Sequence, residues 1–380
     1  MLPALPAAAG DGAGFAAAVG CATAEEISEL LRAARADGVA LVSAGARSLL
    51  GRMVPAEAGA RRILLDTTAC RGVLALDAEA LLLRVRAGTP LPQARAAAEE
   101  AGLRLVGVEP SDPGTVGGWL ATTARIHDPV LALPVSPALG ISSVLPDGTA
   151  WRSITSPRSA CGPDLGALFF GTGGAFGVLT EAALRLAPGG SERKRISVQL
   201  NQPVQAAEVL RRAALGPLPP AEGSALIWVD GRGARVELGF EGTAGLVEEA
   251  VRELREHLKS ITARELRSGE DAPLAVAKDL PVAGGVRWSR LERVITEFNL
   301  PLVDALMLDR PEVSGCRLRV LGGEPASLAA RLRRFLDPDG ERGRARAAEF
   351  ERLRRVKREL DPGSLLNPQA LPWLEREVLA

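Results

Sequence analysis

The strongest structural signal in the sequence is the segment Gly171-Thr172-Gly173-Gly174-Ala175-Phe176-Gly177-Val178-Leu179-Thr180-Glu181. Four of its first seven residues are glycine, which is more than a single turn requires. The apolar run that follows, 178–186, is typical of a buried strand. Because glycine has no Cβ, such a loop lets a ligand approach the main chain closely.

Two further loops of small residues precede this segment. One is Pro110-Ser111-Asp112-Pro113-Gly114-Thr115-Val116-Gly117-Gly118-Trp119-Leu120-Ala121-Thr122, in which paired glycines allow close approach to a flat ligand. Thr115 and Thr122 add hydroxyl groups that can donate hydrogen bonds to it. The other is Ala44–Ser48, directly after a predicted strand, where successive backbone N–H groups can converge on an anion such as a pyrophosphate. A plain turn explains this last loop equally well.

Two better-known glycine motifs are excluded. No lysine follows a glycine anywhere in the chain, so a P-loop is absent. Residues 12–17 fit the spacing G-x-G-x-x-A, but no predicted strand precedes them. A dinucleotide-binding fingerprint requires that strand, so this match carries no weight.

The composition excludes several classes of protein. Lys plus Arg and Asp plus Glu are both 46, so the net charge is zero and nucleic acid or an anionic membrane is not an expected partner. The four cysteines form no C-x-x-C pair, which argues against zinc and iron–sulfur sites and fits a reducing cytoplasm. With His127 and His257 as the only histidines and no tyrosine, a three-histidine metal site and phenol-based acid–base catalysis are excluded. We expect no metal.

Local signals predict the elements and one clear boundary. Thr23-Ala24-Glu25-Glu26 is a capping box that opens a helix ending at Asp37-Gly38. Pro188-Gly189-Gly190 separates two regions. Before it the pattern predicts two hairpins, at 72–86 and 139–154, and a helix at 90–101. After it the order is strand, helix, two strands and helix (196–258), which favours an antiparallel sheet with helices on one face, and 284–291 and 316–321 are further strand candidates. A charged, arginine-rich helix is predicted at 340–360.

In their order and spacing, the three glycine-containing loops resemble those of the FAD-linked oxidases of the vanillyl-alcohol-oxidase type, which carry a PCMH-type FAD domain. The resemblance covers residues 22–188 and resumes at 353–367, where RRVKRELDPGSLLNP is similar to the closing segment of the family. Ala44, Ala46 and Arg47 stand where the family usually has more glycine. The resemblance implies an α+β fold, with a two-subdomain FAD-binding domain followed by a smaller α+β cap domain built on an antiparallel sheet.

The expected domains follow from this resemblance and from the Pro-Gly-Gly boundary. They are a leader at 1–21, the FAD-binding domain at 22–188, a cap or substrate domain at 189–340, and a C-terminal helix and tail at 341–380 that returns to the FAD domain. The leader is apolar but has no basic n-region and no run long enough to span a bilayer, so we expect a cytoplasmic protein without a direct membrane span.

The resemblance also implies which residues bind FAD. The pyrophosphate would lie on the 44–48 loop, the 111–122 segment would follow the diphosphate and the isoalloxazine edge, and the main chain of Val178 would meet the flavin pyrimidine. The expected cofactor residues are Ala44, Gly45, Ala46, Arg47, Ser48, Pro110, Ser111, Gly114, Thr115, Gly117, Gly118, Ala121, Thr122, Gly174, Gly177 and Val178. We expect non-covalent FAD, because the 44–48 loop has no histidine, the usual linkage residue of the family there. Cys161 is either a second linkage site or a small buried residue.

Catalysis in the family is hydride transfer to flavin N5, which needs a base for the substrate hydroxyl proton. His127 is either that base or an ordinary loop residue. Arg287 and Arg290, which flank Trp288 on a predicted strand, either clamp a substrate carboxylate or face solvent. For Asp164 we favour a structural helix cap over catalysis.

Within the family, the chain is most similar to the FAD-binding subunits of bacterial glycolate oxidases, in length, in AGARSLLGRMV and in Gly322-Gly323. Those subunits follow the Gly-Gly with histidine, whereas this chain has Glu324. This implies oxidation of a 2-hydroxy acid, or electron relay in a complex with flavoprotein and iron–sulfur subunits. The alkyl-dihydroxyacetonephosphate synthases share TVGGWLATTA but use a tyrosine and a histidine-rich segment that are absent here. A third alternative is a catalytically inactive flavin-binding scaffold.

Overall fold

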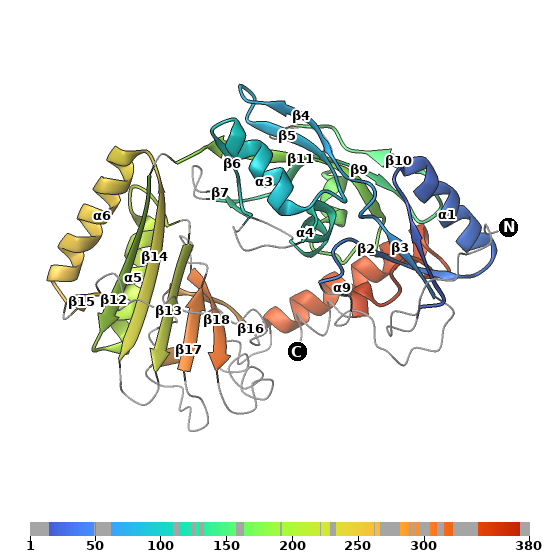
Figure 1. Cartoon of the computed structure of the whole chain (residues 1–380). Helices are drawn as coiled ribbons and strands as arrows, with labels where there is room; N and C mark the ends of the chain where they lie inside the picture. Colours follow the sequence, from blue (N-terminus) through green and yellow to red (C-terminus); the bar gives the residue numbers. More distant parts are fainter. Residues whose placement is uncertain are drawn as a thin grey trace. The chain divides into compact units, whose positions relative to one another are not determined.

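The computed structural model describes residues 15–48, 50, 62–108, 114–123, 126–128, 133–156, 163–190, 192–220, 222–228, 233–261, 263–266, 282–288, 291, 294–295, 305–309, 315–321 and 341–372. Contacts divide the chain into two compact units (Figure 1). The first contains Met1–Asp128, Pro134–Gly189 and Ala345–Ala380, and the second contains Pro129–Leu133 and Gly190–Arg344.

The first unit begins with a three-stranded parallel sheet. Its order is β1 (Ala17–Gly20), β3 (Arg62–Asp66) and β2 (Ala40–Ala44). Helix α1 (Ala24–Ala36) packs on this sheet with Ile27, Leu30 and Leu31 buried. This subdomain therefore has the βαβ character that parallel strands require.

The predicted capping box at the start of α1 is confirmed. The Thr23 hydroxyl accepts a hydrogen bond from the Glu26 N–H at 3.2 Å, and the Glu26 carboxylate accepts one from the Ala22 N–H at 2.7 Å. The first bond satisfies one of the helix's otherwise unpaired N-terminal donors, and the second ties the residue before the cap to the first turn. At the other end, Gly38 has a φ of +62°, which glycine adopts without strain.

The expected leader was too long. Ala17–Gly20 form strand β1, which pairs in parallel with β3, and Cys21 is buried in the core of the first subdomain. A strand of four small residues has no periodic hydrophobic pattern, so only its backbone pairing with β3 identifies it.

A six-stranded antiparallel sheet forms the rest of the first unit. Strand β11 (Val178–Pro188) is central to it, pairing with β9 and β5 along its length and with β6 at its end. The other strands are β4 (Val73–Asp77), β5 (Leu82–Arg86), β6 (Leu103–Leu105), β9 (Ala138–Val144) and β10 (Ala150–Arg152). The pairings of β4 with β5 and of β9 with β10 confirm both predicted hairpins.

Three short or medium helices complete this subdomain. Helix α3 (Leu91–Glu100) and helix α4 (Val116–Thr122) place apolar side chains in the same core as the six-stranded sheet. The 3-10 helix η1 (Leu165–Phe169) begins at Asp164, whose carboxylate accepts a hydrogen bond from the Gly166 N–H at 3.0 Å. The interpretation of Asp164 as a structural cap is therefore confirmed.

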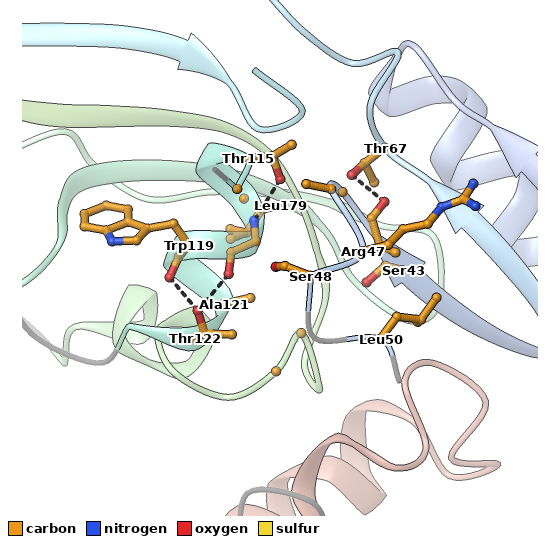
Figure 2. Close-up of a pocket in the computed structure, with 18 of the residues that line it drawn as sticks. Ser43, Arg47, Ser48, Leu50, Thr67, Thr115, Trp119, Ala121, Thr122 and Leu179 are labelled. Atoms are coloured by element: carbon orange, nitrogen blue, oxygen red, sulfur yellow. Dashed lines mark hydrogen bonds between the residues drawn. The ribbon is translucent and has the colours of Figure 1, made fainter. Parts of the chain in front are cut away.

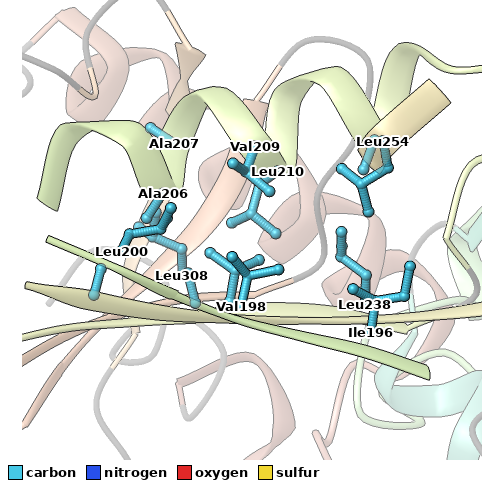
Figure 3. Close-up of a cluster of buried hydrophobic side chains, with 14 of the residues drawn as sticks. Ile196, Val198, Leu200, Ala206, Ala207, Val209, Leu210, Leu238, Leu254 and Leu308 are labelled. Carbon is cyan, nitrogen blue, oxygen red and sulfur yellow. The ribbon is translucent and has the colours of Figure 1, made fainter. Parts of the chain in front are cut away.

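The second unit is built on a seven-stranded antiparallel sheet. The strand order is β15-β12-β14-β13-β17-β18-β16. Their bounds are β12 (Glu192–Leu200), β13 (Glu222–Trp228), β14 (Ala234–Gly242), β15 (Ala263–Glu265), β16 (Val282–Arg287), β17 (Ala305–Asp309) and β18 (Gly315–Leu321). Helices α5 (Pro203–Leu215) and α6 (Ala244–Lys259) pack on it, as the order of predicted elements indicates (Figure 3).

The prediction of a strand at 284–291 was wrong at its end. Strand β16 stops at Arg287, and Trp288 and Leu291 are helical. Leu291 and Val294 are fully buried in the second unit's core, with Trp288 and Ile295 packed against it. This spacing of three and four residues matches a helix face, and burial of that face overrides the local strand signal.

A two-stranded ladder and a long helix complete the described elements. The strands β7 (Ile126–Asp128) and β8 (Leu133–Val135) form a two-stranded ladder. Helix α9 (Glu341–Leu360) carries Leu353, Val356 and Leu360 against the core of the six-stranded sheet. Of the helices that the structure describes, none has the length and apolar composition to cross a membrane.

Candidate flavin site

The first unit contains a pocket that encloses about 1090 Å³ of empty space, including space open to solvent. Three segments of the chain supply most of its wall, and they come from the loop after β2, from α4, and from the loop before β11 (Figure 2). The lining residues are Val42, Ser43, Ala44, Gly45, Ala46, Arg47, Ser48, Leu50, Thr67, Leu91, Gly114, Thr115, Gly117, Gly118, Trp119, Ala121, Thr122, Gly173, Gly174, Gly177, Val178 and Leu179.

The loop after β2 is held close to the start of α4. A Cβ on Gly45 would collide with the Thr115 hydroxyl, so only glycine allows this approach. Below the loop, the Thr67 hydroxyl donates a hydrogen bond to the Ala44 carbonyl at 3.1 Å, and the Thr67 N–H donates to the same oxygen at 2.9 Å. Figure 2 shows Ser48 pointing into the space between this loop and α4.

Arg47 in this loop is anchored away from α4 (Figure 2). Its guanidinium forms an ion pair with Asp66 at 3.0 Å. Burial by itself would raise the pKa of the Asp66 carboxyl, but hydrogen bonds from Thr68 and Arg47 outweigh it and lower that pKa below its usual value. The φ of Arg47 is +59°, in the left-handed region that glycine adopts more readily than arginine.

The second wall is α4, whose hydrogen-bonding groups are largely used within the helix. The Thr115 hydroxyl accepts from the Gly118 N–H at 3.3 Å and caps the helix. The Thr122 hydroxyl donates to the Gly118 carbonyl at 3.0 Å, so it does not point a free donor at a ligand. Gly117 lies against β5's end, where its N–H donates to the Ala87 carbonyl at 2.7 Å.

The third wall is the glycine loop before β11. Gly173 and Gly174 have φ values of +64° and +73°, in the left-handed region that favours glycine. The Gly173 N–H donates to the Ala121 carbonyl at 2.8 Å, which joins this loop to α4. A Cβ on Gly177 would lie 2.7 Å from a Phe169 ring carbon, so this position too excludes larger residues.

All predicted cofactor residues that the structure describes line this one pocket. They are Ala44, Gly45, Ala46, Arg47, Ser48, Gly114, Thr115, Gly117, Gly118, Ala121, Thr122, Gly174, Gly177 and Val178. Pro110 and Ser111 lie outside the described residues. That these residues contact FAD stays a prediction.

Sequence reasoning missed several lining residues. Thr67 and Leu91 follow β3 and begin α3, and neither position carries a glycine or motif signal. Ser43, Leu50 and Leu179 adjoin predicted segments, so widening those segments by a few residues would have found them. Thr67 and Leu91 reach the pocket only because the fold brings separate elements together.

None of the predicted catalytic residues is among the described residues that line this pocket. Arg287 is exposed at the end of β16 in the second unit, and Arg290 lies outside the described residues. His127 lies in strand β7 and not in the loop that we expected, because Ile126–Asp128 pair with β8, and its side chain is outside the described part of the chain. Of the lining residues named above, Arg47 alone carries a charge, and it is paired with Asp66.

No other reactive group stands out in the described part of the first unit. Cys21 and Cys70 are buried free thiols, and burial raises the pKa of Cys21 to about 11 and also raises that of Cys70. Cys161 lies outside the described residues. Within the described ranges there is no group of three or more His, Cys, Asp or Glu side chains that could hold a metal ion.

The residues present fit a large, flat ligand with a polyanionic group. A Cβ on Gly45 would collide with Thr115 of the neighbouring wall, and a Cβ on Gly177 would lie too close to Phe169 behind the wall, so the main chain comes to the surface of the pocket at these glycines. Main-chain N–H groups favour phosphate oxygens, and the apolar wall residues Leu91, Trp119 and Leu179 suit a ring system. This is the surface that FAD requires.

Comparison with known proteins agrees with this fit. Residues 15–153 match the family described as FAD binding domain. The chain is 27% identical over 383 residues to glycolate oxidase subunit GlcE of Escherichia coli, covering 92% of this chain and 97% of that protein. It is also 27% identical over 166 residues to the mitochondrial D-lactate dehydrogenase [cytochrome] 1 of Saccharomyces cerevisiae, covering 43% of this chain but only 28% of that protein.

Solved structures share the fold. An alkyldihydroxyacetonephosphate synthase has a TM-score of 0.70 at 16% identity, over 93% of this chain and 76% of that chain. A p-cresol methylhydroxylase has a TM-score of 0.69 at 15% identity, over 94% and 89%. The α+β architecture with a PCMH-type domain is thereby confirmed. The match of residues 15–153 to the FAD-binding domain family and the similarity to glycolate oxidase subunit GlcE indicate an FAD-dependent oxidoreductase.

Proposed function

We propose that this chain is the FAD-binding subunit of an enzyme that oxidises a 2-hydroxy acid, of the glycolate-oxidase type. The observation that carries the proposal is the similarity to glycolate oxidase subunit GlcE, which extends over 97% of that protein. The partial similarity to a D-lactate dehydrogenase supports the same substrate class, because glycolate and D-lactate are both 2-hydroxy acids.

The proposed cofactor site is the pocket between the loop after β2, α4 and the loop before β11. In this proposal the main chain of Ala44–Ser48 faces the pyrophosphate, the described part of the 111–122 segment follows the diphosphate and the isoalloxazine edge, and the Val178 main chain faces the pyrimidine. The glycines that let these walls approach support this arrangement. We propose non-covalent FAD, since residues 44–48 contain no histidine.

Bound FAD supplies the redox chemistry by accepting a hydride at N5. The chain's own contribution is to bind and orient the cofactor and to handle the proton and carboxylate of the substrate. We propose His127 as the base, because it is the only histidine of the proposed FAD-binding domain at 22–188. Arg287 and Arg290 of the proposed substrate domain at 189–340 are the proposed carboxylate clamp.

A subunit role is favoured over a self-sufficient dehydrogenase. Among the described lining residues no side chain is free to act as an acid or base, since Arg47 is paired with Asp66. A chain whose described pocket wall offers no acid or base either takes that group from another part of the protein or passes electrons to partner subunits. We propose flavoprotein and iron–sulfur subunits as the partners; the Escherichia coli relative is named as a subunit, which supports the existence of partner subunits in general.

The test begins with an absorption spectrum of the purified protein and quantification of the flavin released by acid. One FAD per chain, fully released, is expected. A panel of 2-hydroxy acids, including glycolate and D-lactate, should then bleach the flavin under anaerobic conditions. Bleaching only after addition of partner subunits would support the relay role. Full flavin occupancy without bleaching by any 2-hydroxy acid, with or without partners, would contradict the substrate class.

The catalytic assignments need separate variants. His127→Asn should abolish bleaching while flavin content stays at the wild-type level, and Arg287→Met and Arg290→Met should raise the substrate concentration needed for half-maximal bleaching. Arg193→Met, which removes an exposed arginine of β12 paired with Glu241, is the matched control. Wild-type bleaching by His127→Asn would remove this residue as the base.

Two alternatives are tested by the same preparation. Structural similarity does not favour the alkyldihydroxyacetonephosphate synthase class, because the p-cresol methylhydroxylase fits almost equally well. Product formation from an acyl-dihydroxyacetonephosphate would nevertheless establish that class. Flavin that binds stoichiometrically but is reduced by no substrate in any assembly would instead indicate an inactive scaffold.

A further inference from the structure

We propose that Asn367, near the end of the chain, is a positioning residue that sets the separation of two walls of the flavin pocket. The inference rests on the proposed position of FAD in this pocket. It concerns the closing segment Asp361–Asn367, which follows α9 and belongs to the first unit. Neither Asn367 nor any other residue of this segment lines the pocket, so its effect acts through the walls.

The Asn367 side chain joins strand β2, which leads into the 44–48 loop, to the glycine loop before β11. Its carbonyl oxygen accepts a hydrogen bond from the Ser43 N–H at 2.9 Å. Its amide nitrogen donates to the Ser43 hydroxyl and to the Gly174 carbonyl, both at 2.8 Å. Ser43 and Gly174 both line the pocket, and they belong to two different wall segments that lie close together at Asn367. One buried amide therefore connects the two walls directly.

The geometry leaves little freedom at this junction. Asn367 is buried, with 3% of its surface exposed, and a Cβ on Gly174 would lie 2.7 Å from the Asn367 amide nitrogen. The φ of Asn367 is +45°, in the left-handed region that asparagine tolerates better than most residues. Asparagine therefore meets two requirements here, a left-handed backbone and an amide with both a donor and an acceptor.

The closing segment is itself held firmly against β2. The Leu41 N–H donates to the Leu365 carbonyl at 2.7 Å, and the Asn367 N–H donates to the Leu41 carbonyl at 2.8 Å. These bonds extend the parallel sheet by one bridge, between Leu41 and Leu366. The position of Asn367 relative to Ser43 is thus fixed by backbone as well as side-chain bonds.

A buried ion pair completes the attachment to the glycine loop. The Lys357 ammonium donates to the Asp361 carboxylate at 2.7 Å, to the Leu366 carbonyl at 2.7 Å and to the Ala175 carbonyl at 2.6 Å. Asp361 also accepts from the Leu365 and Leu366 N–H groups, each at 3.0 Å. Gly174 is therefore bonded to Asn367 of the closing segment, and Ala175 is bonded to Lys357 of α9, which in turn holds the closing segment through Asp361 and Leu366.

It follows that FAD binding and docking of the closing segment stabilise each other. A ligand that bonds to both walls favours the separation that Asn367 imposes, and by linkage the docked segment favours the ligand by the same factor. The segment would then act on FAD affinity without touching FAD.

Three variants separate this role from simple support of the fold. Asn367→Gly removes all three side-chain bonds and keeps the left-handed backbone. Asn367→Asp keeps the shape and the bond from the Ser43 N–H, but places an acceptor opposite the Gly174 carbonyl. Ser364→Gly is the matched control, because Ser364 also has a positive φ, +47°, lies in the same segment, and is exposed.

The measurement is the Kd of the apoprotein for FAD, from quenching of flavin fluorescence, together with the visible circular dichroism of the bound flavin. We expect Asn367→Gly to raise the Kd at least about tenfold, since buried hydrogen bonds are lost on both walls. Asn367→Asp should raise it by at least as much, and both should alter the flavin dichroism. Ser364→Gly should match the wild type in both readouts.

A second measurement examines the linkage itself. Saturating FAD should slow amide hydrogen exchange of residues 361–367 in the wild type and in Ser364→Gly, and the slowing should disappear in Asn367→Gly. Wild-type Kd and dichroism in Asn367→Gly and Asn367→Asp would overturn the proposal. So would a reduced thermal stability of these apoproteins with an unchanged Kd, since Asn367 would then only support the fold.

Different results would contradict the role of Asn367 and the proposed function. Wild-type protein that binds no FAD would remove the flavin site and with it the basis of the inference. Wild-type protein that binds FAD but is reduced by no 2-hydroxy acid would leave the inference about Asn367 intact, because its readouts are affinity and dichroism.

Discussion

The pocket of the first unit and the core of the second unit are built from opposite kinds of residue. Glycines recur in each segment of the pocket wall, and a larger residue is excluded at Gly45 and Gly177, where a Cβ would strike a neighbouring residue. The second unit's core is filled by aliphatic side chains from α5, α6 and the seven-stranded sheet, among them Val198, Leu210 and Leu238, all fully buried (Figure 3).

This contrast separates ligand binding from stability. Large side chains between helix and sheet stabilise a domain through apolar burial, and each can be lost only at a cost of a few kcal/mol. Small residues at the pocket contribute little burial, so their positions are set by hydrogen bonds, ion pairs and close approach. Substitutions in the two regions should therefore affect different measurements.

The largest effect is expected from the ion pair that holds the closing segment. Lys357→Met leaves the Asp361 carboxylate buried without its cation and should lower the free energy of unfolding of the first unit by about 3–5 kcal/mol. Burial lowers the pKa of Lys357, and its bond to Asp361 opposes part of that shift. The readout is native-state hydrogen exchange of peptides from β11. Arg358→Met, at an exposed neighbouring position, is the control, and an equal loss there would contradict the prediction.

A core substitution in the second unit should be slightly less severe and leave flavin untouched. Leu210 on α5 is fully buried, so Leu210→Ala removes apolar contacts and leaves a cavity, at a cost of about 3 kcal/mol. Hydrogen exchange of peptides from β14 should speed up, while FAD stoichiometry stays at the wild-type value. Leu215→Ala, on the same helix but with the side chain 49% exposed, is the control. Loss of flavin in Leu210→Ala would show that FAD binding depends on the core of the second unit, which contradicts this prediction.

The converse experiment places a methyl group in the pocket wall. In Gly45→Ala the new Cβ collides with the Thr115 hydroxyl, so the loop must move and the Kd for FAD should rise about tenfold, which is about 1.4 kcal/mol. Thermal stability of the second unit should not change. Gly20→Ala lies in the same three-stranded sheet with nothing within 4 Å of the added Cβ, and it should bind FAD normally. Equal affinities of the two variants would show that the close approach is unimportant for the ligand.

The smallest effect concerns the ion pair at the pocket's outer edge. Because the folded-state pKa of Asp66 is lowered, its carboxylate contributes stability above its usual pKa near 3.9, and this is lost as pH falls through that range and below. In Asp66→Asn, the free energy of unfolding should therefore fall less steeply than in the wild type as the pH drops from about 5 to 3. The difference between the two proteins should be less than about 1 kcal/mol, because the ion pair is partly exposed. Glu29→Gln, at an exposed position of α1, is the control in the same urea titrations at each pH. A steeper loss of stability in acid for Asp66→Asn would contradict a lowered pKa of Asp66 in the folded protein.

Elements with a local signal were predictable from the sequence. The capping box begins α1 at the expected residue, and the turn at 146–148 joins β9 to β10 as a hairpin. The glycine-containing loops were identified as ligand-binding for a reason that also holds in the fold, since their close approaches tolerate no Cβ. Each of these features depends on residues within a few positions of one another, or on an intrinsic property of glycine.

Features that depend on distant partners were not predictable. Strand β1 exists because it pairs with β3, and the helix at Trp288 and Leu291 exists because its face is buried in the second unit's core. Thr67 reaches the pocket only after β3 is laid beside β2. In each case burial or pairing across a large sequence separation outweighs a weak local preference.

By itself, the sequence determined the kind of site: three loops whose glycines allow main-chain contact with a flat, anionic cofactor, in a chain with no free acid or base motif beside them. Only the tertiary structure decided how these loops meet, because their separation depends on Asn367, more than 320 residues after Ser43, and on the buried Lys357–Asp361 pair. An asparagine near the C-terminus has no distinguishing local pattern. Its role arises from burial, which removes water as an alternative partner and makes each of its hydrogen bonds to the two walls costly to lose.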